Sequence, residues 1–520
     1  MKRCPKCHRA ETEDALMFCR VDGTRLIPDS LTSDSAPTAI LHAAPESGGA
    51  STRSLQGTPS IAILPFANLS NDTENEYFCD GLAEELLNAL AKIENLKVAA
   101  RTSAFSFKGS NTNVSEIGRV LNVNSVLEGS VRKSGDRLRI TVQLINASDG
   151  YHLWSERYDR QMKDIFDVQD EITLAVVDAL RVKLLGEDKA ALLKRYTDNT
   201  EAYQLYLKGR YFYNKYTAED LQIGIEHFER AIEKEPEYAP AYAGIGFCYG
   251  ALWYFGFSAP HEIMHKWRAV INRALEIDSD LADAHLSLAS IHFYYEWDFT
   301  EAERSYRRAI VLNANSPDAH WRYGHFLAAL GRFEEAIGEG RRALELDPLS
   351  LVAKFFMVRI YWFANLLDDA LAQARGMIEM APGFPSAYVA LGGVYLQKGM
   401  YEEAVKAYQK ALSLQGFVGF IQSYLGAVYG MMGKRDEALN VLSQLLELRK
   451  TQYVTAYGIA CVYGGLGENG KAFDWLGKAV EEKNGEIVFL KREAEANVFD
   501  ESIRRDPRFT ELLRKVGLPQ

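Results

Sequence analysis

The stretch Tyr388–Leu412, YVALGGVYLQKGMYEEAVKAYQKAL, contains two helix-like segments separated by a Lys398-Gly399 turn. Small residues of this stretch recur along the chain at a constant interval of 34 residues: Gly324, Val358, Gly392, Gly426 and Ala460. A second series with the same interval comprises Ala336, Ala370, Ala404, Ala438 and Ala472. A small residue at one place in each helix lets two helices approach closely, so the shared period predicts stacked helical hairpins.

This pattern resembles the tetratricopeptide repeat, and the dipeptides at 330–331, 398–399, 432–433 and 466–467 fall at its turn. Gly209, Gly246 and Ala289 extend the pattern towards the N-terminus with less regular steps. We therefore predict about eight repeats over residues 200–485, which form an all-α superhelix. The second repeat is stretched by residues 251–267, which we expect to lengthen its helices. Residues 486–520 are predicted to form a terminal capping helix.

The resemblance implies a concave groove that is lined by the first helix of each repeat and binds a protein or peptide partner. Seven side chains are assigned to this groove: Phe247, Phe293, Trp321, His325, Phe355, Arg359 and Trp362. We expect solvent-facing aromatic residues to contact a partly apolar peptide, and Arg359 to bind an acidic group. The alternative, which stays open for each residue, is that these side chains pack against neighbouring helices.

The first residues, MKRCPKCHRAETEDALMFCRVDGTRL, contain a pattern of metal ligands. Cys4 and Cys7 form a C-x₂-C pair, and Cys19 and Asp22 repeat the spacing with an oxygen ligand in the fourth place. Paired ligands two residues apart can hold Zn²⁺ from one tight turn. His8 is a rival for the fourth ligand. The alternative is three free thiols and no metal.

So short a segment with little apolar content cannot build a core unaided, which favours a structural zinc ion. Residues 1–27 resemble the short zinc-ribbon domains at the head of many bacterial multidomain proteins. Residues 28–58 are rich in Ser, Thr, Ala, Pro and Gly, and they predict a flexible linker.

A mixed pattern of strands and helices follows over residues 59–186. Residues 60–70 begin as an apolar run typical of a buried strand, and Leu82, Leu86, Leu90 and Ile93 share one face of a helix. Ser115 is a candidate cap for a second helix. Apolar residues alternate with polar ones over residues 138–144, which indicates a strand with one solvated face. We predict an α+β domain on a mainly antiparallel sheet.

This part resembles the TolB amino-terminal-like domain, through ILPFANLSNDTENEYFCDGLAEELLNAL, RTSAFSFKG, VLNVNSVLEGSVRKSGDRLRITVQLINASDGYHLWSERYDR and DIFDVQDEI. The resemblance implies a place in bacterial signalling and provides no catalytic residues. The acidic residues Asp80, Glu84 and Asp164 lie near the expected starts of helices, where the helix dipole favours negative charge. We therefore expect them to cap helices and not to act as catalysts.

The composition excludes several classes of protein. The net charge of −11 disfavours a nucleic-acid partner. No apolar run approaches the roughly 20 residues that cross a bilayer, so we expect no membrane association. Cys79, Cys248 and Cys461 are scattered, which fits buried thiols in a cytoplasmic protein.

The sequence contains no phosphate-binding loop, kinase motif set or nucleophile elbow, so we expect no enzyme activity. A non-enzymatic scaffold or adaptor in bacterial signalling is the favoured function. One alternative is a transcription regulator that contacts nucleic acid through the zinc ribbon. The other is an accessory subunit of a kinase or nucleotide cyclase system.

Overall fold

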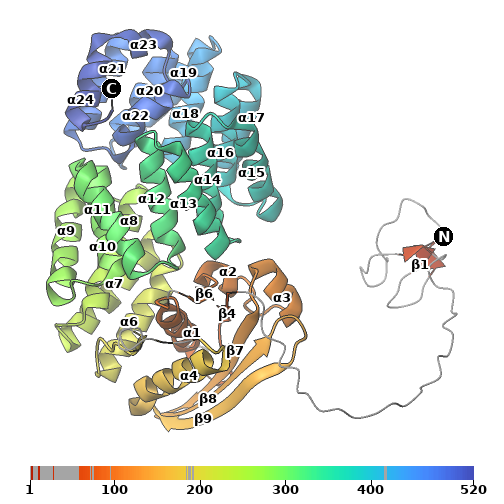
Figure 1. Cartoon of the computed structure of the whole chain (residues 1–520). Coiled ribbons are helices and arrows are strands. Elements are labelled where there is room, and N and C mark those ends of the chain that lie inside the picture. The colour runs from red at the N-terminus through yellow and green to blue at the C-terminus, as the bar shows by residue number, and fades with distance from the viewer. Residues whose placement is uncertain are drawn as a thin grey trace. The chain divides into compact units, whose positions relative to one another are not determined.

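The computed structural model describes residues 58–519, except 71, 73–74, 94, 183, 185–188, 190–191 and 415–417, and six residues nearer the N-terminus. The chain divides into two compact units, Met1–Gln56 and Gly57–Gln520 (Figure 1). In the first unit, the described residues are three short strands: β1 (Lys2–Arg3), β2 (Ala10–Glu11) and β3 (Ile27–Pro28). They form an antiparallel sheet in the order β2-β1-β3.

The predicted metal ligands lie outside the described residues: Cys4, Cys7, His8, Cys19 and Asp22. The predicted linker, 28–58, also lies outside them, apart from its two end residues. The zinc site and the linker therefore stay predictions.

The second unit begins with a six-stranded mixed sheet. Its strands are β4 (Ser60–Ile63), β5 (Ala67–Asn68), β6 (Lys97–Val98), β7 (Ser125–Ser134), β8 (Arg137–Asn146) and β9 (His152–Gln161). The order is β6-β4-β7-β8-β9, with β5 also paired to β7. Strands β6, β4 and β7 are parallel, whereas β7, β8 and β9 are antiparallel. The prediction of a mainly antiparallel sheet is wrong for the first half, because helical crossovers connect β4 to β6 and β6 to β7.

Helices cover both faces of the parallel half of the sheet and one face of its antiparallel half. They are α1 (Glu76–Leu90), α2 (Arg101–Phe105), α3 (Val114–Leu121) and α4 (Ile165–Ala179), the last preceded by the 3₁₀ turn η3 (Met162–Asp164). Ile61 and Ile63 pack with α1, whereas Ala62 points to the opposite side and packs with α3. The cap of α3 is Asn113, whose side chain accepts a hydrogen bond from the N–H of Glu116, and not Ser115 as predicted.

Eight helical pairs follow within the described residues and stack into a superhelix (Figure 1). The helices are α6 (Thr200–Tyr213), α7 (Ala218–Lys234), α8 (Ala239–Tyr254), α9 (Pro260–Ile277), α10 (Ala282–Ile291), α11 (Phe299–Leu312), α12 (Pro317–Ala329), α13 (Phe333–Leu346), α14 (Leu351–Phe363), α15 (Leu367–Met380), α16 (Pro385–Gln397), α17 (Tyr401–Ser413), α18 (Val418–Met431), α19 (Arg435–Leu448), α20 (Ala456–Gly465) and α21 (Asn469–Glu481). We call the side formed by the first helix of each pair the inner face.

The 34-residue period has a visible physical cause. A Cβ atom on Gly392 would lie 2.6 Å from the ring of Tyr408, so the first helix can pack on the second only with glycine there. Gly399 between the two helices has φ +71°, a left-handed conformation that glycine adopts without strain. In the second pair, α8 has 16 residues and α9 has 18, as the inserted residues 251–267 predict.

The prediction of a single capping helix at the C-terminus is wrong. The residues form four short segments: η5 (Gly485–Phe489), α22 (Leu490–Glu495), α23 (Glu501–Arg505) and α24 (Pro507–Val516). Asn497 has φ +61° just after the end of α22. Asp500 caps α23 by accepting a hydrogen bond from the N–H of Ser502, and Pro507 begins α24. These local signals divide the stretch, because each one starts or stops a helix.

The sheet and the first repeats share one hydrophobic core. A single cluster of buried side chains runs from β4 and α1 through α4 to α6, α7 and α8. The mixed sheet is thereby joined to one end of the superhelix. Of the C-terminal segments, η5 and α22 contact η4 (His292–Glu296) and α14, whereas α24 packs on α21.

Candidate protein-binding surface

The seven predicted groove residues lie on the inner face. They belong to α8, α12, α14 and η4 (His292–Glu296), a π-helical turn that continues α10. Five of them are buried, namely Phe293, Trp321, His325, Phe355 and Trp362, and Arg359 is half-buried with 12% of its side chain exposed. Phe247 is half-buried and stacks on Tyr213 at 6.0 Å. The expectation that these residues face solvent is therefore wrong for six of the seven.

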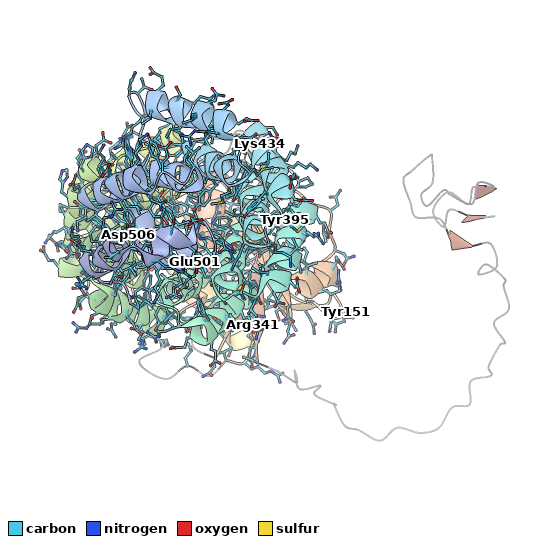
Figure 2. All side chains as sticks on the ribbon, turned by 90° about the horizontal axis from the view of Figure 1, so that it is seen from above. Tyr151, Arg341, Tyr395, Lys434, Glu501 and Asp506 are labelled. Atoms are coloured by element: carbon cyan, nitrogen blue, oxygen red, sulfur yellow. The ribbon has the colours of Figure 1, made fainter. Side chains whose placement is uncertain are left out.

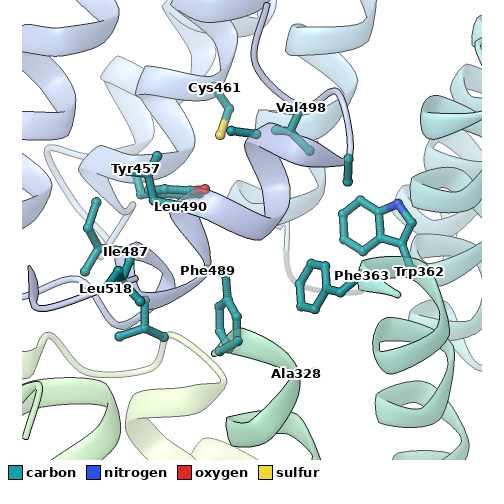
Figure 3. Packing of buried hydrophobic residues seen from close by; sticks show 14 of the residues in the cluster. Ala328, Trp362, Phe363, Tyr457, Cys461, Ile487, Phe489, Leu490, Val498 and Leu518 are labelled. Carbon is teal, nitrogen blue, oxygen red and sulfur yellow. The ribbon is translucent and has the colours of Figure 1, made fainter. Parts of the chain in front are cut away.

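The physical reason is a stretch of the same chain, residues 485–499, which we call the inner segment. Its Phe489 lies among rings from three first helices, with centroids 5.9 Å from Phe293, 4.5 Å from His325 and 5.7 Å from Phe363. The Arg359 guanidinium lies 4.9 Å above the Phe489 ring. Figure 3 shows Phe489 pointing between these helices, beside Phe363. The groove is therefore filled from within the chain.

A buried carboxylate of the inner segment binds the arginine that was predicted to bind an acidic group. Glu493 is 1% exposed, and its Oε1 accepts hydrogen bonds from Arg359 Nη2 at 3.3 Å and Tyr424 Oη at 2.9 Å. Its Oε2 accepts from Tyr457 Oη at 2.9 Å. Burial raises the pKa of Glu493, while Arg359 and the two hydroxyl groups act in the opposite direction. Arg359 thus recognises an acidic group, but an internal one.

His325 and Trp321 are held by neighbours of the inner face. His325 accepts a hydrogen bond from Arg359 Nε at its Nε2, 3.2 Å away, and its Nδ1 lies 3.2 Å from Tyr294 Oη. Burial, followed by the charge of Arg359, lowers the pKa of His325 well below its usual value, so the imidazole is neutral. Trp321 stacks on Phe356 at 4.1 Å and donates its indole N–H to Asp318.

A part of the inner face remains open at the first two repeats. Six aromatic residues form a connected series in which the centroids of neighbouring rings lie 5.2–6.1 Å apart. We call them the aromatic patch: Tyr213, Tyr216, Phe247, Tyr254, Phe255 and Phe257. Tyr216 and Tyr254 are each 44% exposed, and Phe257 is 47% exposed. Exposed apolar surface of this kind marks interaction sites.

The prediction from sequence missed the exposed members of this patch. Tyr216 and Phe257 lie beyond the ends of α6 and α8, outside the helical register from which groove positions were assigned. The available signal was the inserted stretch 251–267, which places Trp253, Tyr254, Phe255 and Phe257 together after a first helix.

Arg322 is one of the charged side chains near the aromatic patch, and Arg210 is another, 6.0 Å from the centre of the Tyr213 ring. Arg322 lies above the ring of Trp321 at 4.5 Å, and its Nε is buried without a hydrogen-bond partner among the described residues. Partial burial raises the pKa of Tyr254 and of Tyr216, and the charge of Arg322 opposes this rise at both, whereas the carboxylate of Asp318 adds to it at Tyr216. The patch therefore combines exposed rings with a positive charge whose donors are not all used.

At the first repeat, α1 is joined to the superhelix by a buried ion cluster. Glu84 is 3% exposed, and its Oε2 accepts from Arg101 Nε at 2.8 Å while its Oε1 accepts from Arg210 Nε at 3.0 Å. Burial opposes ionisation, but the two arginines outweigh it and lower the pKa of Glu84. The prediction that Glu84 caps a helix is wrong, because α1 begins two turns earlier, at Glu76.

The same correction applies to Asp80, which also lies within α1 and pairs with Lys108 Nζ at 2.7 Å. Asp164 does act as predicted, since its side chain accepts a hydrogen bond from the N–H of Gln161 at the start of η3.

Two further polar contacts join the mixed sheet to the turns between repeats. Asn315 donates through Nδ2 to the carbonyl groups of Ala91 and Leu96, each at 3.0 Å. The hydroxyl of Ser103 donates to Asp347, and burial raises the pKa of that carboxyl to about 6. We call the contacts of Glu84, Asn315 and Asp347 the N-terminal junction.

Cys79, Cys248 and Cys461 are buried and unpaired, as expected, and burial raises the pKa of Cys79 and Cys248 to about 12.

Among the described residues, no helix is long and apolar enough to cross a bilayer, and no group of three or more His, Cys, Asp or Glu side chains could hold a metal ion.

Comparison with known sequence families agrees with the two parts of the second unit. Residues 288–350 and 384–451 match families of the tetratricopeptide repeat. Residues 56–175 match the second domain of the HilA/YgeH-like transcriptional regulators. The C-terminal part of the described chain is therefore a tetratricopeptide superhelix, preceded by a mixed α/β region.

Two relatives show the setting in which similar sequences occur. A Rhizobium meliloti protein named "Putative adenylate cyclase 3" is 34% identical over 291 residues, which are 54% of this chain and 42% of that protein. Transcriptional regulator HilA of Salmonella typhimurium is 23% identical over 225 residues, which are 43% of this chain and 40% of the regulator. The chain thus spans less than half the length of these relatives.

Solved structures give weaker matches. The human IFIT1 dimer is 13% identical over 67% of this chain and 78% of its own, with a TM-score of 0.44. Pseudomonas aeruginosa PilF is 21% identical over 42% of this chain and 94% of its own, with a TM-score of 0.32.

Proposed function

We propose that this protein is a non-enzymatic scaffold of a bacterial signalling system, and that it binds a protein partner at the aromatic patch. Tetratricopeptide proteins typically bind protein or peptide partners, and the rest of the inner face near α12 and α14 is filled by the inner segment. The observation that carries the proposal is the run of linked rings ending in Tyr216, Tyr254 and Phe257, each more than 40% exposed.

The inner segment indicates the chemistry that the inner face accepts. It presents an aromatic side chain, Phe489, and a carboxylate four residues later, Glu493. The aromatic patch repeats this combination of rings beside an arginine, since Arg322 has an unused buried donor. We therefore infer a partner segment with an apolar side chain for the rings and a carboxylate for Arg322.

Site-specific photocross-linking tests this proposal. A benzophenone amino acid at Tyr254 should cross-link one protein partner in cells, whereas the same group at Val311, which is 74% exposed on the second helix α11, should not. With that partner purified, the Tyr216→Ala/Tyr254→Ala and Arg322→Gln variants should each bind at least tenfold more weakly. Val311→Ala is the matched control and should bind normally.

If both variants bound the partner with unchanged affinity, the aromatic patch would not be the binding site. Cross-linking of nucleic acid at Tyr254 would instead favour the second candidate, a transcription regulator, which rests on the match of residues 56–175 to a domain of HilA-like regulators. The third candidate is an accessory component of a cyclase system, which rests on the relative of that name. A cross-linked partner with a cyclase domain would distinguish it from a general scaffold.

We also propose that residues 1–27 bind one structural zinc ion through Cys4, Cys7, Cys19 and Asp22, and that residues 59–186 form a TolB amino-terminal-like domain. Three thiolates and a carboxylate are a ligand set that zinc accepts. Elemental analysis of purified protein should give one zinc per chain, which Cys4→Ser/Cys7→Ser abolishes. Asp22→Ala should weaken zinc retention against a chelator, and His8→Ala should not. The reverse result would assign the fourth ligand to His8.

A further inference from the structure

Strand β9 is an unprotected edge of the mixed sheet. It has ten residues, ends the strand order, and buries only Tyr158 fully. The opposite edge strand, β6, has two residues. In Figure 1, β9 is the outermost strand at the lower edge of the sheet, and Figure 2 places Tyr151, the residue just before it, at the margin of the molecule. Tyr151 is 75% exposed. A long open edge can pair with another strand.

The pairing register determines which backbone groups of β9 point outwards. The β7–β8 hairpin closes on the pair Ser134 and Arg137 across two residues, so odd-numbered residues of β8 bond to β7 and even-numbered ones to β9. The N–H of Met162 donates to the carbonyl of Asp136 at 2.8 Å, which continues this alternation. The residues of β9 that point their N–H and C=O groups away from the sheet are therefore odd-numbered.

These outward groups are Ser155, Arg157, Asp159 and Gln161. No described strand pairs with them. Two contacts involve these groups: the N–H of Gln161 donates to Asp164 at 3.1 Å, and the Arg160 side chain donates to the carbonyl of Asp159 at 3.3 Å. The edge is thus open at Ser155, at Arg157 and at the N–H of Asp159.

We propose that β9 pairs in antiparallel fashion with β9 of a second copy of this chain, about a two-fold axis at Tyr158, so that the two sheets become continuous. Because outward groups must face outward groups, odd-numbered residues pair with odd-numbered ones. Centring the axis on Arg157 or Asp159 would place two like charges opposite each other, which is unfavourable. Centring it on Tyr158 places Arg157 opposite Asp159 of the second copy, and Glu156 opposite Arg160 of the second copy.

In this register each of the four charged residues between 156 and 160 lies opposite a residue of opposite charge in the second copy. Because the axis is two-fold, each of the two kinds of pair forms twice. The existing ion pairs of these residues are no obstacle. Arg139 Nε lies 2.6 Å and Arg157 Nε 3.2 Å from Asp159 of the same chain, and Arg160 Nη2 lies 3.3 Å from Glu171, but each of these side chains is at least 40% exposed. Exposed pairs contribute only about 0–1 kcal/mol and are readily shared.

The proposed register also places Leu153, which is 40% exposed at the start of β9, opposite Lys163 of the second copy, at the segment that joins β9 to α4. This inference is independent of the proposed function, because it concerns the sheet and not the inner face.

Sedimentation velocity of the full chain over a range of concentrations tests the proposal. The mass should rise with concentration from that of one 58.4 kDa chain to that of two. Arg157→Asp places two acidic residues opposite each other, and Asp159→Arg places two arginines opposite each other, so each variant should dimerise at least tenfold more weakly. An equal mixture of the two variants restores opposite charges at every position and should dimerise like the original protein, as should the double variant.

Arg132→Asp is the matched control, since Arg132 is exposed on the central strand β7 and lies away from the edge. Thermal unfolding of each variant confirms that it folds. A mass that stays at one chain up to high concentration would overturn the proposal. Dimerisation of both single variants at the original strength, without gain on mixing, would overturn it as well, because the contact would then lie elsewhere.

Discussion

Two parts of the chain outside the repeats contact the superhelix, and different interactions hold each of them. At the N-terminal junction, polar groups carry much of the contact: Glu84 binds two arginines, and Asn315 donates to two backbone carbonyls. The inner segment instead inserts Phe489 among buried rings and satisfies a single carboxylate, Glu493.

The difference between the two contacts is clearest in the pKa values of their buried glutamates. Two arginines lower the pKa of Glu84 below its ordinary value, whereas burial raises that of Glu493, which has one arginine and two tyrosine hydroxyls. A buried charge with full compensation is a strong local constraint, while a buried acid with partial compensation depends on the apolar packing around it. The junction should therefore depend on charge and pH, and the inner segment on packing.

The largest expected effect is that of Phe489→Ala. Removing a ring that contacts three first helices leaves a cavity, and the free energy of unfolding should fall by about 3–5 kcal/mol. Hydrogen exchange should accelerate in residues 485–499 and stay unchanged in α1. Phe257→Ala, a change at a ring that is 47% exposed, is the control and should cost less than about 0.5 kcal/mol. Equal acceleration in α1 would mean that the two regions are not independent.

The next effect compares the glutamates directly. Glu84→Gln leaves two arginines facing a neutral group, and we expect a loss of about 3 kcal/mol in the free energy of unfolding. Glu493→Gln should cost only about 1 kcal/mol, because both tyrosine hydroxyls can still donate to the amide oxygen. Denaturant titration of the two variants at pH 7 gives the order. A larger loss for Glu493→Gln would reverse the comparison.

The third effect is a pH dependence at the junction. Burial raises the pKa of Asp347 from 3.8 to about 6. The unfolded chain therefore binds fewer protons than the folded chain between pH 4 and pH 6, and stability falls as the pH rises through this window, by at most about 3 kcal/mol.

Asp347→Asn removes that titration and keeps an acceptor for Ser103. The variant should gain stability relative to the original chain as the pH rises from 4 to 6, and the gain should then stay constant. Unfolding curves at pH 4, 5, 6 and 7 measure it. A gain that is the same at all four pH values would show that Asp347 is not protonated in the folded state.

Local features of the chain were predictable because they depend on near neighbours. The 34-residue spacing predicts the helical pairs, since a glycine such as Gly392 is required where two helices touch. The alternation at 138–144 predicts β8. The cap of α3 was misplaced by two residues, because Asn113 and Ser115 are both good capping residues and only the backbone decides between them.

Contacts between distant parts of the chain could not be predicted in this way. Helical register assigns Trp321, His325 and Arg359 to the inner face whether that face is open or filled. Nothing in the local pattern of residues 485–499 distinguishes a terminal cap from a segment that enters the groove. The placement of Glu84 between Arg101 and Arg210 likewise joins three positions that are separated by up to 126 residues.

The sequence by itself determined the repeat, its period and the identity of the side chains on the inner face, because helix pairing follows from residues 3 to 34 positions apart. Only the tertiary structure decided that the chain fills most of that face with its own inner segment, and that the aromatic patch and the edge of β9 stay open. The reason is that the burial of a side chain depends on which surfaces contact each other in the folded chain. The same helical register is compatible with many different tertiary contacts.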